Sequence, residues 1–71
     1  MKPGLILFAH GARDPRWAEP FEAIASAVRA RAPEVDVRLA FLELMTPDLP
    51  RVAAAMAADG CTRIDILPLF L

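Results

Sequence analysis

The chain lacks several features that define large classes of protein. Its 71 residues include one cysteine, Cys61, so no disulfide can form within the chain and a disulfide-stabilised secreted scaffold is not indicated. The N-terminal segment has only five consecutive apolar residues before His10, too few for the core of a signal peptide or for a membrane span. A formal net charge of −1 gives no argument for binding nucleic acid or an anionic membrane. We therefore expect a cytoplasmic protein with neither kind of partner.

Apolar residues, in contrast, are plentiful. Hydrophobic residues make up 56% of the chain and charged residues 24%, a composition too apolar for a disordered segment. A chain of this length forms one domain at most and buries a modest fraction of its surface. We expect a single domain over residues 1–71 that is completed by contact with something else.

Three segments have the pattern of strands in a parallel sheet. Residues 5–9 are a continuous apolar run, which is typical of a strand covered on both faces. Residues 35–42 alternate between apolar and charged side chains before becoming wholly apolar, and residues 63–69 form a third candidate strand. Pro68 cannot donate a ladder hydrogen bond, so it should lie near the end of its strand or at a sheet edge.

An amphipathic helix is expected between the first two strands. Apolar side chains recur at a spacing near 3.6 over residues 17–32, with charged side chains between them. Because proline is tolerated only in a first turn or at a kink, Pro20 places the start of the regular helix near Glu19. Pro33 ends it.

A second helix is expected between the second and third strands, with Thr46 as its cap, Pro47 at its first position and Gly60 just past its end. The order is then β-α-β-α-β, an α/β fold with a parallel sheet and right-handed crossovers. The chain closes on an apolar run, residues 67–71, without the helix that would normally follow. We therefore expect a unit truncated after its third strand, the N-terminal part of a longer one, or one completed by a partner chain.

Two residues with useful chemistry follow neighbouring strands. In open α/β sheets ligands bind at the carboxyl ends of the strands. The first expected strand ends at His10 and the second at Glu43, so an imidazole and a carboxylate should lie at the same edge. This pair suits a divalent ion such as Co²⁺, Fe²⁺ or Ni²⁺, and either group can exchange a proton near neutral pH.

Each candidate also has a structural interpretation, which the residues alone leave open. A histidine at a strand end often only bonds to a loop, and Glu43 could equally be a solvated carboxylate. Arg13 and Asp14 could form no more than a turn and a cap. Cys61 is expected to be a small buried hydrophobic residue rather than a ligand. A packing role is also expected for three further side chains: Trp17, Met45 and Met56.

Three segments resemble the small sirohydrochlorin chelatases of the CbiX and SirB type. They are LILFAHGARDPRWAEPFEAIA (residues 5–25), LAFLELMTPDLP (residues 39–50) and DILPLFL (residues 65–71). An HG-x-RD-P motif directly after an apolar strand, FLE before a helix and PLFL closing a strand are together more specific than any one of them. The resemblance extends over essentially the whole chain.

The resemblance implies a class II chelatase fold, a flavodoxin-like α/β unit present here as a half domain. It also implies a lyase that inserts Co²⁺ or Fe²⁺, sometimes Ni²⁺, into a sirohydrochlorin-type tetrapyrrole without ATP, in cobalamin or siroheme biosynthesis. The metal is then a substrate, and no tightly bound cofactor is expected. Family members occur as homodimers of short chains or as longer chains with two fused units, so the expected partner is a second copy or another chain segment.

Roles for individual residues also come from the resemblance. His10 matches the family's first metal-binding and proton-accepting histidine, and Glu43 matches an acidic residue proposed to assist with the metal. A role for Arg13 comes from its chemistry and not from the alignment: its guanidinium could meet a peripheral carboxylate of the tetrapyrrole through a bidentate contact. By the alignment with the family, three residues lie on segments that line the macrocycle pocket: Met45, Phe70 and Leu71.

The chain departs from the family pattern at two points. The family usually has serine where Ala12 stands, and it continues past PLFL into a glycine-rich loop that carries a second metal-binding histidine. His10 is the only histidine here, so a full metal site needs another chain or segment. Two alternatives remain open. One is a non-catalytic tetrapyrrole- or metal-binding or assembly fragment. The other is a histidine phosphatase, which would require an arginine where Ala9 stands.

Overall fold

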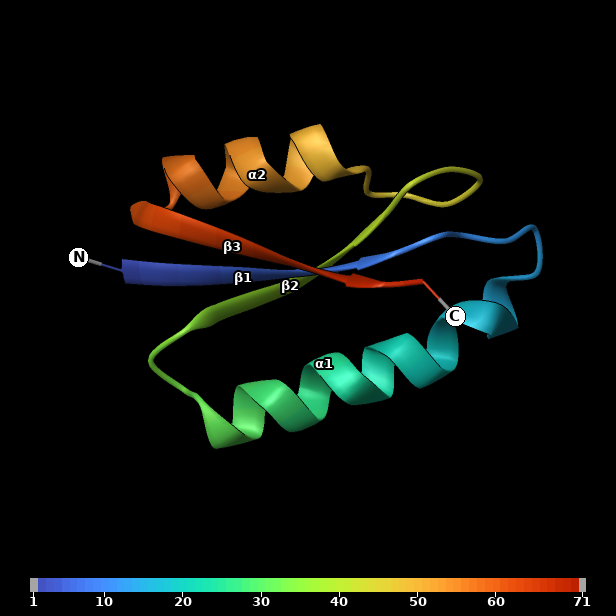
Figure 1. Ribbon diagram of the computed structural model, residues 1–71, viewed down its shortest axis with the longest axis horizontal. Coiled ribbons are helices and arrows are strands. Elements are labelled where there is room, and N and C mark those ends of the chain that lie inside the picture. The colour runs from blue at the N-terminus through green and yellow to red at the C-terminus, as the bar shows by residue number, and fades with distance from the viewer. Residues whose placement is uncertain (1, 71) are drawn as a thin grey trace.

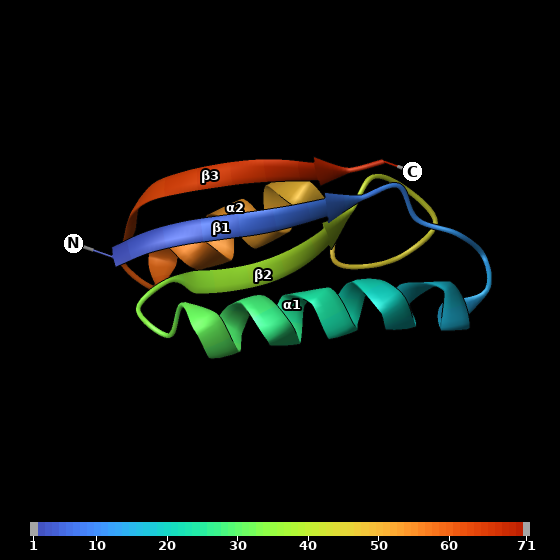
Figure 2. The ribbon, with the colours of Figure 1, turned by 60° about the horizontal axis from the view of Figure 1, so that its bottom comes forward.

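The computed structural model describes residues 2–70, which fold into one parallel sheet between two helices (Figure 1). The elements in chain order are β1 (Lys2–Ala9), the 3-10 helix η1 (Pro15–Ala18), α1 (Glu19–Arg31), β2 (Asp36–Phe41), α2 (Leu49–Ala58) and β3 (Cys61–Leu69). The strand order is β2-β1-β3, with β1 in the centre (Figure 2). The predicted α/β fold with the order β-α-β-α-β is confirmed.

The central strand β1 buries both of its faces, because α1 covers one side of the sheet and α2 the other (Figure 1). Successive side chains of a strand point to opposite faces. Ile6 accordingly packs against Met56 of α2, while Leu7 packs against Ala25 of α1 and Val37 of β2. The uninterrupted apolar run of this strand follows from its position between the two helices.

The helix α2 begins later than the sequence pattern indicates. Its cap is Asp48, whose Oδ1 accepts a hydrogen bond from the N–H of Arg51 at 3.0 Å. The predicted cap Thr46 and first helical residue Pro47 lie in the preceding loop, so that prediction is wrong. Because the N–H of Phe41 donates to the carbonyl of Pro47 at 3.0 Å, this loop runs along the end of β2 and the helix can start only beyond it.

The other proline and glycine signals are confirmed. The helix α1 starts at Glu19 with Pro20 in its first turn, and it ends just before Pro33. Gly60 follows α2 with φ +97°, the left-handed conformation expected past a helix end. Pro68 is the penultimate residue of β3, which is an edge strand.

The two edges of the sheet differ in how they are covered. At β2 the guanidinium Nε of Arg29 donates to the carbonyl of Val37 at 2.9 Å. This hydrogen bond satisfies a backbone carbonyl on the outer side of the edge strand. At β3 the side chains of Ile66 and Leu67 are 48% and 49% exposed, and no strand within residues 2–70 pairs with its outer edge. The unpaired backbone groups of such an edge are open to pairing with another strand.

A polar cluster ties the strands together at the end where the chain enters them. A single Nη2 of Arg38 donates to Asp36 at 2.9 Å and to Asp59 at 2.5 Å. The thiol of Cys61 lies 3.6 Å from Asp36. Burial first, and the charge of Asp36 second, raise the pKa of the Cys61 thiol. This buried neutral thiol fits the structural role predicted for it.

None of the helices within residues 2–70 combines the length and the apolar character needed to cross a bilayer.

Candidate metal-binding site

His10 and Glu43 lie side by side at the carboxyl end of the sheet. His10 directly follows β1 and Glu43 lies just past the end of β2. The imidazole Nε2 is 3.3 Å from the carboxylate Oε1, and each side chain is 58% exposed. The structure therefore brings together the two residues whose convergence the sequence indicates, and it leaves both accessible to a ligand.

Backbone hydrogen bonds hold this pair in place at the point where β1 and β2 end. The N–H of Leu42 donates to the carbonyl of Ala9 at 2.9 Å, and the N–H of Glu43 donates to the carbonyl of His10 at 3.1 Å. Two adjacent hydrogen bonds thus join the loops that carry the imidazole and the carboxylate. The two side chains thus approach each other from loops whose backbones are hydrogen-bonded together.

Aromatic side chains border the imidazole. The ring of Phe70 meets the ring of His10 edge-on, with centroids 6.0 Å apart. On its other side Phe70 contacts Phe8, with ring centroids 5.4 Å apart. Two leucines that flank the carboxylate, Leu42 and Leu44, are also exposed. Apolar surface of this kind suits a flat macrocycle. Leu71, which the resemblance places at the same pocket, lies outside the described residues.

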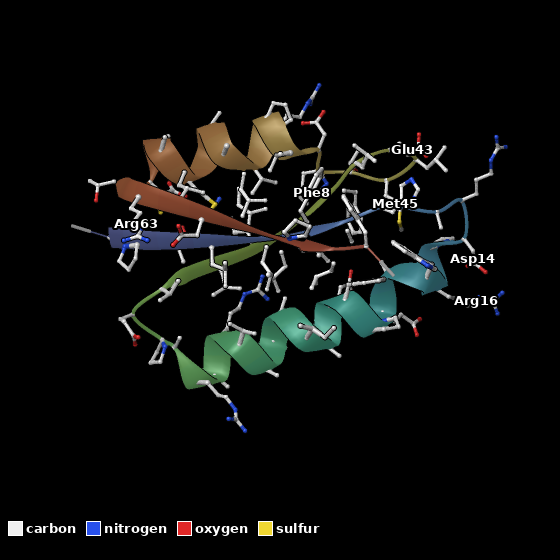
Figure 3. The ribbon with its side chains drawn as sticks, in the orientation of Figure 1. Phe8, Asp14, Arg16, Glu43, Met45 and Arg63 are labelled. Atoms are coloured by element: carbon white, nitrogen blue, oxygen red, sulfur yellow. The ribbon has the colours of Figure 1, made fainter. Side chains whose placement is uncertain are left out.

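Met45 lies on the same segment as Glu43 (Figure 3) but its side chain contributes to packing. It is half-buried against a cluster that includes Ala18, Phe21 and Phe41. The structure thus agrees with the packing interpretation of this methionine, and its predicted contact with a macrocycle stays a prediction.

Arg13 and Asp14 have different roles in the loop after β1. Asp14 caps η1, accepting from the N–H of Arg16 at 2.9 Å and from its guanidinium at 2.9 to 3.2 Å. The side-chain hydrogen bonds from Arg16 hold the pKa of Asp14 below its usual value. Asp14 therefore has the turn-and-cap role. Figure 3 shows it at the same end of the molecule as Glu43. Arg13 is exposed and forms no ion pair or side-chain hydrogen bond within residues 2–70.

The site on this chain can offer a metal ion two ligands. Residues 2–70 contain no group of three or more histidine, cysteine or acidic side chains close enough to hold a metal ion. His10 and Glu43 leave the remaining coordination positions to water, to a substrate or to groups from elsewhere. Such an open set is suited to an ion that is passed on rather than held as a structural metal.

The pair lies on an open rim, outside two cavities that lie beside the sheet. A cavity of about 560 Å³ lies beside the edge strand β2, between α1 and α2, and is lined by Leu39, Arg51 and Val52 among others. A second cavity of about 480 Å³ lies at the opposite end, near Pro33. Neither includes His10 or Glu43.

One residue of the site was not singled out from the sequence. Gly11 has φ +102° and lies directly against the backbone of Glu43. The available signal was a glycine immediately after His10, at the point where the apolar strand ends.

The structure is a parallel α/β sheet with an exposed imidazole and carboxylate at its carboxyl end, two ligand types that suit a divalent metal. The particular family follows from comparison: residues 4–71 match the CbiX family, and the chain belongs to it. The resemblance noted in the sequence is confirmed.

The chain is similar to proteins named sirohydrochlorin cobaltochelatase. It is 33% identical over 70 residues to the one from Methanosarcina acetivorans, covering 99% of this chain and 54% of the relative. It is also 33% identical over 70 residues to the one from Methanothermobacter thermautotrophicus, covering 99% and 48%. The chain thus spans about half the length of the curated relatives it matches.

Among solved structures, the fold is similar to that of a putative cobalamin (vitamin B12) biosynthesis CbiX protein from Marinobacter aquaeolei VT8. The TM-score is 0.79 at 31% sequence identity, covering 94% of this chain and 54% of the other. The α/β fold of the described residues is therefore a fold of this family.

Proposed function

We propose that this chain forms part of a sirohydrochlorin chelatase, which inserts Co²⁺ into sirohydrochlorin in cobalamin biosynthesis without consuming ATP. The observation that carries the proposal is the 3.3 Å approach of His10 Nε2 to Glu43 Oε1 on an exposed rim, in a chain of the CbiX family. Its relatives named sirohydrochlorin cobaltochelatase support cobalt as the metal. Fe²⁺, for siroheme, and Ni²⁺ suit the same ligand types.

Metallation requires the macrocycle to lose two pyrrole N–H protons while the metal exchanges its water ligands for ring nitrogens. A neutral imidazole at His10 accepts one of these protons, and the adjacent Glu43 carboxylate stabilises the imidazolium that forms. The second proton passes to solvent water, which the exposed rim admits. The same pair can instead bind the metal, with both ligand atoms directed at one ion. Either role uses the exposure of the two side chains, because the macrocycle must reach them.

The apolar rim supplies the surface on which the macrocycle rests. Phe70 is exposed beside the imidazole, and Leu42 and Leu44 are exposed on either side of Glu43. Arg13 is available for a bidentate contact with a peripheral carboxylate. Met45 and Leu71 are the remaining residues proposed to line this surface.

We propose that a second copy of the chain or another chain segment completes the site. The two-ligand set of the described residues supports this, since a metal with only two protein ligands is weakly held. The exposed Ile66 and Leu67 on the unpaired edge of β3 also support it. A homodimer is one form of such an assembly. We expect it to act in the cytoplasm.

The test is an anaerobic metallation assay with Co²⁺ and sirohydrochlorin, followed by the change in the absorption spectrum of the macrocycle. We expect turnover by the wild type and none by His10→Ala. Stoichiometric binding of metal and macrocycle without metallated product would instead identify a carrier or assembly unit. Hydrolysis of a generic phosphomonoester would identify a phosphatase, although the residue before His10 is the buried Ala9 and not an arginine.

A further inference from the structure

The closest approach in the site is between the backbones of two loops and not between their side chains. At Gly11, a Cβ atom would lie 1.9 Å from the carbonyl oxygen of Glu43 and 3.0 Å from its carbonyl carbon. Atoms that are not bonded cannot approach so closely. The obstacle is backbone, which cannot rotate away as the end of a flexible side chain would. The backbone of Gly11 also has φ +102°, a conformation that side chains rarely permit.

The Glu43 backbone has no freedom to accommodate a larger residue at position 11. Its N–H donates to the carbonyl of His10 at 3.1 Å, and its carbonyl accepts from the N–H of Met45 at 2.8 Å. Leu44, between these residues, adopts φ +65°. A displacement of the Glu43 carbonyl therefore disturbs its hydrogen bond from Met45. Through the same residue it also disturbs the Glu43–His10 hydrogen bond that joins the two loops.

We propose that Gly11 is a positioning residue for the His10–Glu43 pair: the absence of its side chain lets the two loops approach closely enough for the pair to form. The effect of Gly11 on metal insertion rests on the proposed function. The effect of Gly11 on the geometry of the pair does not, because the pair and the hydrogen bond between the loops exist whatever ligand binds there.

The test compares Gly11→Ala with a matched control, Gly60→Ala, in the full-length protein. Gly60 has nearly the same backbone conformation, φ +97°, but a Cβ there meets no atom within 4 Å. Both variants carry the backbone strain of a left-handed residue, and only Gly11→Ala forces the loops apart. The first readout is the hydrogen exchange rate of the Glu43 amide by NMR. We expect faster exchange in Gly11→Ala than in Gly60→Ala after correction for global stability. Equal rates would overturn the proposal.

The second readout is affinity for Co²⁺ alone, measured by titration of its visible absorption bands. Loss of a residue that orients metal ligands typically costs about 10- to 100-fold in affinity, and we expect Gly11→Ala to fall in that range while Gly60→Ala binds as the wild type does. In a Glu43→Gln background the effect of Gly11→Ala should shrink, because the pair on which it acts is already lost. An undiminished effect in that background would contradict a role exerted through Glu43.

If Gly11→Ala does not fold, hydrogen exchange of the Glu43 amide in the wild type tests the proposal instead. A Glu43 amide protected from exchange supports the close approach, and one that exchanges as in an unstructured peptide overturns it. The outcome is separable from that of the proposed function. A wild type that inserts no metal into sirohydrochlorin, but responds to Gly11→Ala as described, retains the positioning role and loses the chelatase assignment.

Discussion

The N–H of Glu43 donates to the carbonyl oxygen of His10 at 3.1 Å, one step beyond the point where β1 and β2 end as strands. This bond joins the two loops directly beyond the last pair of the ladder, Ala9 and Phe41. The imidazole and carboxylate are consequently carried by loops whose backbones are tied to each other. Rigid placement of this kind is what a site that binds or deprotonates a ligand requires.

His10→Ala is expected to abolish metal insertion and to leave the fold unchanged. The imidazole is the only one in the chain and is largely exposed, so its removal deletes a proton acceptor or ligand without opening a cavity in the core. Metallation rate and thermal unfolding by circular dichroism, measured on the same sample, check the two statements. Insertion at the wild-type rate would exclude His10 from the chemistry.

Glu43→Gln is expected to weaken Co²⁺ binding by about 10- to 100-fold, since it keeps the shape of the side chain and removes its negative charge. Isothermal titration calorimetry would measure the change. Glu34→Gln, at an exposed glutamate at the other end of the sheet, is the matched control and should bind Co²⁺ as the wild type does. Equal affinities for Glu43→Gln and Glu34→Gln would show that the carboxylate takes no part.

The free energy of unfolding is expected to fall in acid because of Asp36. Its pKa is held below the ordinary 3.8, chiefly by hydrogen bonds from Arg38. A carboxyl group with a lowered pKa in the folded state contributes stability above its unfolded pKa and loses it as the pH falls through the folded value. The loss should therefore develop below about pH 3.8.

Asp36→Asn should remove this acid-dependent part of the stability and cost about 1–3 kcal/mol at neutral pH, because it leaves a partly buried guanidinium short of a partner. Urea titrations at several pH values measure both effects. Asp65→Asn, at an exposed carboxylate of β3, serves as the control. If the two variants have the same pH dependence, the Asp36–Arg38 pair is not the cause.

Asp48→Ala is expected to destabilise the protein by about 0.5–2 kcal/mol, since the cap of α2 then leaves the N–H of Arg51 without its acceptor. Thr46→Ala should have little effect, because that side chain caps nothing in the structure. Chemical denaturation of the two variants compares them directly. A larger loss of stability for Thr46→Ala than for Asp48→Ala would show that Thr46 is the cap, as the sequence pattern indicates.

The elements themselves were predictable because the signals that specify them are local. The apolar run of residues 5–9 predicted a strand covered on both faces, Pro20 placed the start of α1, and Gly60 marked the end of α2. The start of α2 was not predictable in this way. Thr46-Pro47 satisfies the rules for a cap as well as Asp48 does, and the choice depends on the hydrogen bond from Phe41 to Pro47, which forms only when β2 and the loop lie together.

From the sequence it was possible to predict that His10 and Glu43 each follow a strand and lie at the same end of the sheet, because the apolar pattern shows where a parallel strand ends. Tertiary structure alone decided the rest: the 3.3 Å between His10 and Glu43, the burial of Met45, and the contact that excludes a side chain at Gly11. These depend on sheet register and on loops that meet from distant parts of the chain. A pattern of neighbouring residues encodes which face is buried, but it contains no distance between segments that only packing brings together.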